Sequence, residues 1–475
     1  MLMVRCNSSS SKVGIAYVKG DMRKVYSDPL ILESAILSAL KGFFAGDFST
    51  ANPFSGVVKP GSTVLIKPNW VLHENWCGED VYCLYTQPAL VAAAVRLIAK
   101  ASPSRIIIGD SPVQNCDLSK LLTDAAKKMI TEAAGAVPVE FIDFRRTVTE
   151  RNDFARGVST NRRPLDRYIL FDLGQDSLME PLCAPSDPFR ITNYDPRELA
   201  KTHHRGRHQY LLCREVFEAD VVINMPKLKS HKKAGMTGAL KNLVGINGSK
   251  DFLPHHRVGG SGWGGDCYRG RAPLKRLAEW FMDRANRHLG KSRYSFWRSF
   301  SEAAIAAHRR ISPYGDAEME GSWYGNDTVW RMTLDLNRLL LYGRTDGTLS
   351  DQRQRVVYTL TDALMAGDGE GPLSPKPLAL GLVTFSSDSA VSDFVNCALM
   401  HFDWKKIPQV REAFGAFKYK LTDVNPGDVE VAMDGQPVSL EEAALKYGRP
   451  FVASVGWQDH VEDIPLRRKA HATVY

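Results

Sequence analysis

The stretch from Asp220 to Arg257 contains more side chains capable of chemistry than any other segment of similar length. It reads DVVINMPKLKSHKKAGMTGALKNLVGINGSKDFLPHHR. After a buried-strand pattern at Val221–Ile223 comes a basic segment that we expect to be a loop, with Lys227, Lys229, His231, Lys232 and Lys233. Glycines and a short helical run follow. A strand that ends in cations, glycines and a helix start is typical of a site for anionic groups.

Lys241 is the most informative single residue of this stretch. It lies in a predicted helical run, Thr237 to Val244, that is otherwise almost entirely apolar. A lysine removed from water has a lowered pKa and can act as a base or a nucleophile. The alternative is a surface lysine whose stem lies along an apolar face. We take Lys241 and His231 as candidate catalytic residues, and Thr237 and Asn242 as candidate substrate contacts.

Two histidines, His255 and His256, close the stretch. They are candidates for metal ligation, for acid–base work, or for ordinary hydrogen bonding in a loop. We expect at most one of them to bind a metal, and the nearby carboxylates are only Asp251 and Asp266. The sequence does not identify a cofactor. A divalent metal, nickel or zinc, is a candidate, and no iron–sulfur cluster is expected. A second histidine group among arginines suits a phosphate-binding surface: His203, His204 and His208.

Four other predicted strand ends carry side chains of the same kind. They are Lys67–Asn69, Gly109–Pro112, Gly369–Gly371 and Ser387–Asp388. In an open α/β sheet such ends meet along one crevice. We therefore expect Asp110 to be a catalytic base or orienter. We expect substrate contacts from Lys67, Asn69, Lys227, Lys229, Glu370 and Asp388. Considered singly, Asp110 and Asp388 could instead cap helices.

Alternating strands and helices must position these residues. We expect strands at 13–18, 63–66, 105–109, 139–144, 168–171, 221–223, 356–360, 378–385 and 429–433. We expect helices at 30–44, 88–101, 118–134, 272–288, 294–310, 328–342 and 440–446, with one more ending near 400. The alternation predicts an α/β fold: a doubly wound, mostly parallel sheet with an inserted helical hairpin and a small C-terminal extension.

The domain boundaries follow from these elements. We expect a disordered tail at 1–12, which lacks the apolar core of a secretory signal. The α/β core takes 13–260, with a basic loop at 145–209, and resumes at 346–430. A helical insertion lies between them at 261–345, and a C-terminal extension takes 431–475.

The composition excludes several classes of protein. With 44% hydrophobic and 24% charged residues, the chain is typical of a globular protein. No apolar run approaches the roughly 18 residues that span a bilayer, so we expect a cytoplasmic protein without a membrane partner. None of the 8 cysteines forms a C-x-x-C pair, which predicts free thiols and no iron–sulfur cluster. P-loop and G-x-S-x-G motifs are absent.

Seven segments together resemble the domain-of-unknown-function family 362. They are KPN at 67–69, Thr86-x-Pro88, GDSP at 109–112, VINMPKLKSH at 222–231, TGALKN at 237–242, GDGEGP at 367–372 and SSDSAVSD at 386–393. The resemblance covers roughly residues 60 to 430, apart from the helical insertion. Some members carry a ferredoxin-type iron–sulfur module, for which this chain has no cysteine pattern. Ser389 follows Asp388 where the family usually has proline.

The spacing of His231 and Lys241 is also similar to the central motif of nickel-pincer lactate racemases. That similarity implies a histidine that approaches the cofactor and a lysine that anchors it, here His231 and Lys241. It further implies a nickel ligand, here His255 or His256. This chain has Ala239–Leu240 where the racemases are glycine-rich, and it lacks their early D-x-T-R-P pattern.

Three functions from different classes remain open. The leading hypothesis is a cytoplasmic enzyme, a transferase or isomerase, acting on a small anionic sugar, carboxylate or phosphate compound through Lys/His acid–base or covalent chemistry. The second is an isomerase or epimerase that depends on a metal or pincer cofactor. The third is a non-catalytic nucleic-acid- or anion-binding protein that uses the basic segments 145–167 and 201–214. Nucleic acid is the least favoured partner, because these segments lack interleaved aromatics.

Overall fold

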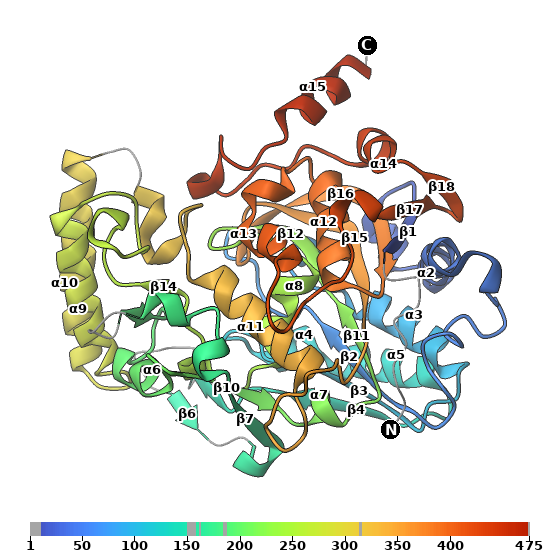
Figure 1. Cartoon of the computed structure of the whole chain (residues 1–475), viewed down its shortest axis with the longest axis horizontal. Helices are drawn as coiled ribbons and strands as arrows, with labels where there is room; N and C mark the ends of the chain where they lie inside the picture. The colour runs from blue at the N-terminus through green and yellow to red at the C-terminus, as the bar shows by residue number, and fades with distance from the viewer. Residues whose placement is uncertain (1–10, 150–157, 161–162, 184–187, 313–315, 474–475) are drawn as a thin grey trace.

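A large mixed sheet runs through the centre of the molecule (Figure 1). The computed structural model describes residues 11–149, 158–160, 163–183, 188–312 and 316–473. Across the sheet the strands follow in the order β18 (Gln436–Val438), β17 (Glu430–Met433), β1 (Lys12–Tyr17), β16 (Ser374–Ser386), β15 (Val357–Glu370), β11 (Val221–Met225), β2 (Thr63–Pro68), β3 (Arg105–Asp110) and β4 (Val139–Asp143). From β15 to β4 every neighbouring pair is parallel, whereas β16 is antiparallel to both β15 and β1.

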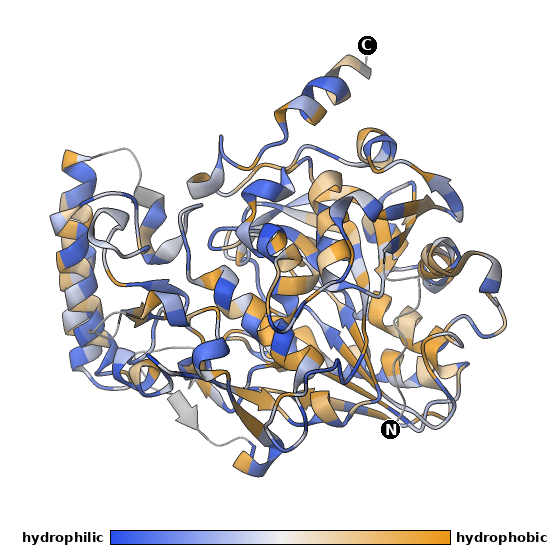
Figure 2. Cartoon of the chain, in the orientation of Figure 1, coloured by the Kyte–Doolittle hydropathy of each residue, from blue (hydrophilic) through white to orange (hydrophobic). Residues whose placement is uncertain are grey.

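Helices cover both faces of this sheet, because alternate side chains of each strand point to opposite sides. Val64 and Ile66 pack in one core with α2 (Pro29–Phe44), α3 (Pro88–Ala99) and α5 (Asp124–Ala134). Leu65, between them, packs in a second core with α11 (Val329–Tyr342). Figure 2 shows apolar residues concentrated in the central strands and on the sheet-facing sides of these helices. The predicted doubly wound, mostly parallel α/β sheet is confirmed.

The predicted helical hairpin is also present. It consists of α9 (Pro273–Asn286) and α10 (Arg293–Ile311), which lie together at the left of Figure 1, away from the sheet. In the C-terminal region, α14 (Leu440–Tyr447) and α15 (Ile464–Thr473) follow β17 and β18. The expected boundary at 430 falls within β17, which pairs with β1 and so belongs to the central sheet.

One helix departs from the composition analysis. Among the described residues, Pro29–Asp47 alone is long and apolar enough, by length and composition, to cross a membrane, whereas we expected no such segment. Its side chains Leu32, Ile36, Leu40 and Phe43 are buried in the core against the sheet. Packing within the protein therefore accounts for part of the apolarity of this helix, while Leu30 and Ile31 are exposed.

Two predicted local structures are wrong. The predicted helix 118–134 is interrupted, because the Thr123 side chain caps a new helix, α5, by accepting from Ala126 N–H at 3.2 Å. The basic segment after Pro226 is a buried strand, β12 (Lys227–His231), rather than a loop. It pairs with β15 and with β13 (Gly235–Thr237).

The basic region 145–209 contains short regular elements. Besides three short 3-10 helices among the described residues, they are β5 (Thr147–Thr149), β6 (Val158–Thr160), β7 (Tyr168–Asp172), β8 (Phe189–Arg190), α6 (Pro196–Thr202), β9 (His203–His204) and the start of β10 (Arg207–Cys213). Parts of this region, 150–157, 161–162 and 184–187, lie outside the described residues, as do residues 1–10 of the expected tail.

Candidate functional site

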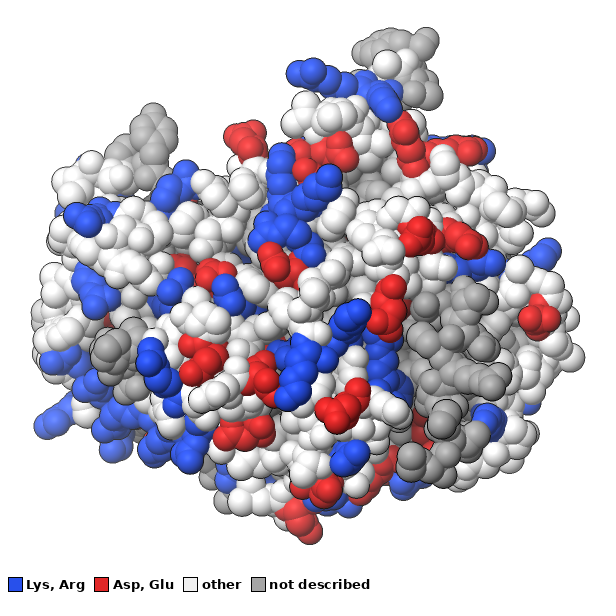
Figure 3. Space-filling model, viewed as in Figure 1, with Lys and Arg blue, Asp and Glu red and all other residues white. Residues whose placement is uncertain are grey.

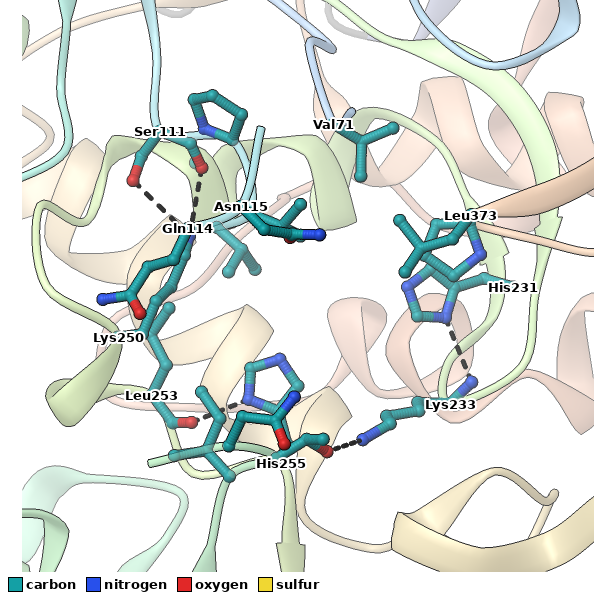
Figure 4. Close-up of a pocket in the computed structure, with 18 of the residues that line it drawn as sticks. Val71, Ser111, Gln114, Asn115, His231, Lys233, Lys250, Leu253, His255 and Leu373 are labelled. Carbon is teal, nitrogen blue, oxygen red and sulfur yellow. Dashed lines mark hydrogen bonds between the residues drawn. The ribbon is translucent and has the colours of Figure 1, made fainter. Parts of the chain in front are cut away.

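A cavity of about 500 Å³ opens at the carboxyl ends of β2, β3 and β12, with α9 and α10 contributing its outer wall. Seven Lys and Arg side chains border it: Lys67, Lys229, Lys232, Lys233, Lys241, Lys250 and Arg298. Only three carboxylates do so: Asp110, Glu302 and Glu320. Figure 4 shows His231 and Lys233 on one side of the space and Lys250 with Ser111 on the other. The cavity therefore has an excess of positive charge.

Lys67 and Asp110 form a buried ion pair at the base of the cavity, with 2.7 Å between Nζ and Oδ1. Asp110 also accepts from the backbone N–H groups of Trp70 and Ser111, both at 2.7 Å. Burial raises the pKa of the Asp110 carboxyl and lowers that of the Lys67 ammonium, and their contact opposes both shifts. With its partners already in place, Asp110 neutralises and orients Lys67.

Gly245 makes that ion pair possible. A Cβ at this position would lie 2.1 Å from Asp110 Oδ1 and 2.7 Å from Lys67 Cε, closer than atoms can approach. The expected result of Gly245→Ala is a loss of about 1–3 kcal/mol in the free energy of unfolding, since both buried side chains must move. Urea unfolding followed by circular dichroism measures this loss. Gly427→Ala is the control, because a Cβ there meets nothing within 4 Å. Equal stability of the two variants would contradict the steric argument.

Four other lysines of the cavity differ from Lys67 in having no acidic partner. Within the described part of the chain, no carboxylate forms an ion pair with Lys229, Lys232, Lys241 or Lys250. Burial is the first cause that lowers the pKa values of three of them, to about 7 for Lys229, about 7 for Lys241 and about 8 for Lys250. Neighbouring cations contribute, above all Lys227 for Lys229 and Lys250 for Lys241.

Hydrogen bonds fix two of these lysines. Lys229 Nζ donates to Asn69 Oδ1 at 2.8 Å and to the Leu84 carbonyl. Lys250 Nζ donates to the Ser111 carbonyl at 3.0 Å. The Lys241 ammonium has no hydrogen-bond partner among the described residues and borders the cavity. Lys241 is thus more available to a bound molecule than Lys229 and Lys250.

Asp393 positions the short helix that carries Lys241, α8 (Ala239–Asn242). Its carboxylate accepts the backbone N–H groups of Ala239 and Leu240 at 2.6 and 3.0 Å. A Cβ on Gly238 would lie 2.0 Å from Asp393 Oδ1, so glycine is needed for this close approach. Burial raises the pKa of Asp393 to about 6.

The hydrogen bonds of His231 and His255 determine what each ring presents to the cavity. His231 Nδ1 accepts from Lys233 N–H at 3.0 Å, so a neutral His231 carries its proton on Nε2. His255 Nδ1 lies 2.7 Å from the Leu253 carbonyl, which can only accept, so its Nε2 holds a lone pair. Burial lowers the pKa of both rings well below the usual value. One neutral imidazole therefore offers a donor and the other an acceptor.

Most of the predicted site residues border the cavity: Lys67, Asn69, Asp110, Lys229, His231, Thr237, Lys241, Asn242 and His255. Asn242 is engaged, accepting from Lys67 Nζ at 3.1 Å and donating to Asn224 Oδ1 at 2.7 Å. Thr237 is buried and its Oγ1 has no hydrogen-bond partner in the described structure. Lys232, Lys233, Lys250 and Gly245 border the cavity as well but were not predicted. The KSHKK run gave a signal for Lys232 and Lys233, whereas Lys250 had none.

Four predicted residues lie elsewhere. Lys227 forms a buried ion pair with Asp362 at 2.7 Å. Glu370, at the tip of the β15–β16 hairpin, accepts from Val455 N–H at 2.7 Å. Asp388 caps α12 (Ser389–Leu399). It lies at the opposite edge of the sheet from the cavity, because β16 runs antiparallel to β15. His256 lies with Cys267 and Glu279 on a second cavity of about 270 Å³.

Comparison with known proteins places the chain in a family. The Thylakoid-associated protein sll1697 of Synechocystis sp. is 26% identical over 351 residues, which cover 74% of this chain and 67% of that protein. A crystal structure of a Thermotoga maritima protein matches 77% of this chain at 11% identity and a TM-score of 0.30, and the match spans only 56% of that protein. The family model "Domain of unknown function (DUF362)" matches residues 64–169 and 164–398, a region that includes every residue bordering the cavity. This chain belongs to the DUF362 family, as its sequence motifs predict.

Proposed function

We propose that the cavity binds a small molecule with at least two anionic groups and that Lys241 acts on it as a base or nucleophile. The observation that carries this proposal is the presence of Lys229, Lys241 and Lys250 in one cavity without carboxylate partners. A buried ammonium group without a counter-ion either loses its proton or attracts an anion. A carboxylate, phosphate or sugar-acid group supplies that anion.

The lysines and histidines then have different roles. Lys229 and Lys250, held by hydrogen bonds, bind the anionic groups. A lysine with a pKa of about 7 is half neutral near pH 7, so Lys241 carries the lone pair that a base or nucleophile needs. His231 and His255 orient the polar groups of the ligand with one donor and one acceptor.

Replacing Lys241 tests this assignment. In Lys241→Met we expect the affinity for sulfate, used as a probe dianion in calorimetry, to fall at least about tenfold, or about 1.4 kcal/mol. The matched control is Lys128→Met, since the Lys128 side chain lies on α5, is 76% exposed and does not border the cavity. His231→Ala should weaken binding less, because it removes no charge. Unchanged sulfate affinity in Lys241→Met would remove Lys241 from the site.

A nucleophilic role of Lys241 can be tested by trapping a covalent product. If Lys241 attacks the carbonyl carbon of an anionic aldehyde such as glyoxylate, water leaves and an imine forms, which cyanoborohydride reduces to a secondary amine. Peptide mapping by mass spectrometry should then find the added mass on Lys241. Labelling spread equally over exposed lysines would leave Lys241 only the role of a base or an anion contact.

A metal- or pincer-cofactor-dependent isomerase is the second candidate. The observation in its favour is His255, whose Nδ1–H is held by the Leu253 carbonyl so that the Nε2 lone pair is free for a metal. His256, the other predicted ligand, borders a different cavity. Nickel that is bound by the purified protein and lost in His255→Ala would favour this candidate, and retention of that nickel in His255→Ala would exclude it.

Location and nucleic-acid binding also stay as proposals. We propose that the protein is cytoplasmic. Its relative is described as thylakoid-associated. Cell fractionation tests the location by showing whether the protein is recovered in the soluble or the membrane fraction. Figure 3 shows basic and acidic side chains on the face in view, with basic ones gathered at its lower left. Because the basic segments 145–167 and 201–214 lack interleaved aromatics, we propose that the protein is not retained on nucleic acid at low salt.

A further inference from the structure

A second group of reactive side chains lies apart from the cavity. Glu180 belongs to the short helix η7 (Glu180–Leu182), Cys183 follows it, and His208 is on β10. One ligand atom from each lies within 4.8 Å of the others. His208 Nε2 is 3.1 Å from Glu180 Oε2 and 3.5 Å from Cys183 Sγ. The His208 side chain is fully buried, whereas Glu180 and Cys183 are half-buried.

Hydrogen bonds determine which nitrogen of His208 carries a proton. His203 Nε2 lies 2.9 Å from the Phe252 carbonyl, which can only accept, so His203 donates through Nε2. A neutral His203 that donates through Nε2 has an acceptor at Nδ1, which lies 3.2 Å from His208 Nδ1. His208 then donates through its Nδ1 and presents an unprotonated Nε2 to Glu180 and Cys183.

A metal ion is one way to join the His208 lone pair, the Glu180 carboxylate and the Cys183 sulfur, whose ligand atoms all lie within 4.8 Å of one another. A metal ion fits the distances. Zinc bonds are about 2.0–2.1 Å to nitrogen, 2.0–2.2 Å to oxygen and 2.3 Å to sulfur. In a tetrahedral site, a nitrogen ligand therefore lies roughly 3.3 Å from an oxygen ligand and roughly 3.6 Å from a sulfur ligand. The observed separations are 3.1 and 3.5 Å.

We propose that Glu180, Cys183 and His208 bind one zinc ion, with a fourth coordination position taken by water or another donor. A mixed set of nitrogen, sulfur and oxygen ligands is typical of zinc and unlike the all-oxygen sites of magnesium and calcium. The thiol loses its proton to solvent on binding, and the bond from His208 Nδ1 to His203 orients the metal-bound ring.

This site has a structural connection to the cavity. The hydrogen-bonded path from His208 through His203 ends on Phe252, in the segment that also carries Lys250 and His255. Thr202 Oγ1 donates to the carbonyl of the neighbouring Asp251 at 3.1 Å. Zinc therefore fixes η7 to β10 and supports, through His203, the segment that brings Lys250 and His255 to the cavity. This inference goes beyond the proposed function and does not depend on it.

A second Glu–Cys–His group provides a matched control. His256, Cys267 and Glu279 also lie within 4.8 Å of one another, and all three are buried. In both groups ligand atoms also accept backbone N–H groups: Glu180 Oε2 accepts from Gly206 at 2.8 Å, the Glu279 carboxylate from Gly259 at 2.9 and 3.1 Å, and Cys267 Sγ from Glu320 at 3.2 Å. We assign the metal to the Cys183 group because one nitrogen, His208 Nε2, contacts both of the other ligand atoms, and we use Cys267 as the comparison.

Cobalt titration of the full-length protein tests the proposal. After chelation and reduction, we expect one equivalent of cobalt to bind, with the near-ultraviolet charge-transfer band of a thiolate ligand, and zinc to displace it. Cys183→Ser should lose that band and weaken binding at least about tenfold, whereas Cys267→Ser should keep both. Circular dichroism confirms that each variant is folded. A band that survives in Cys183→Ser and disappears in Cys267→Ser would overturn the proposal, as would folded wild-type protein that binds no stoichiometric metal.

Discussion

Asp362→Asn is expected to lower the free energy of unfolding by about 3–5 kcal/mol, because it leaves a buried charge without its partner. Lys227 Nζ lies 2.7 Å from Asp362 Oδ2, and both side chains are 0% exposed. Tyr26 also donates to Asp362 Oδ1 at 2.5 Å and accepts from Lys227 Nζ at 2.9 Å. Removing the carboxylate therefore breaks a network that has no access to water.

Three measurements separate this effect from a general loss of stability. Urea unfolding of Glu132→Gln, which breaks an exposed ion pair with Lys128, should change stability by less than about 1 kcal/mol. The double variant Lys227→Met with Asp362→Leu should recover at least half of the loss, since it removes both charges. The loss should also shrink at high pH, where Lys227 sheds its proton. An Asp362→Asn protein as stable as the wild type would contradict the role of this pair.

The same variant tests where the functional site is. Lys227 does not border the cavity, although Lys229, two residues further along β12, does. Folded Asp362→Asn protein should therefore retain its sulfate affinity. A large loss of affinity in the folded variant would show that Lys227 contributes to the site, as its sequence position predicts.

The contrast between Lys227 and Lys229 shows what the sequence could not predict. Six polar or charged residues between Pro226 and Ala234 indicate a loop. The chain nevertheless forms a buried strand, because the side chains of Lys227, Lys229 and Ser230 each find a distant partner. Asp362 neutralises Lys227, and Asn69, 160 residues away in sequence, accepts from Lys229. Such partners depend on the tertiary fold, so no local pattern reveals them.

Strand ends located cavity residues only where the strands are parallel, and even there Glu370, at the end of β15, lies elsewhere. Lys67, Asp110 and Lys229 follow or end parallel strands and meet at one edge of the sheet, as predicted. Ser387–Asp388 also ends an apolar strand, but β16 runs antiparallel to β15. An apolar run such as Leu378–Phe385 indicates a buried strand and carries no information about its direction. Asp388 was therefore assigned to the wrong edge.

The unpaired lysines make a second large effect measurable. If one lysine must be protonated to bind sulfate, sulfate affinity is expected to fall by about 100-fold between pH 6 and pH 9. The binding free energy then weakens by about 1.4 kcal/mol for each pH unit above the pKa of that lysine. In the unliganded protein Lys229 and Lys241 have pKa values of about 7, so they are protonated at pH 6 and neutral at pH 9. Sulfate stays a dianion over this range. Binding at pH 9 must therefore take up protons, which calorimetry in buffers of different ionisation enthalpy detects.

The stability of the unliganded protein should change with pH in the opposite direction. The folded pKa of Lys229, about 7, is below its value of 10.5 in the unfolded chain, so between these values the unfolded state holds more protons. Stability should then rise as pH increases from about 7 toward 10.5, and saturating sulfate should flatten that rise by keeping the lysine protonated. Lys229→Met should remove part of the slope in the absence of sulfate, whereas Lys128→Met should leave it unchanged. If wild-type sulfate affinity and proton uptake are the same at pH 6 and pH 9, the lysines are paired in solution and the cavity does not bind anions in the way proposed.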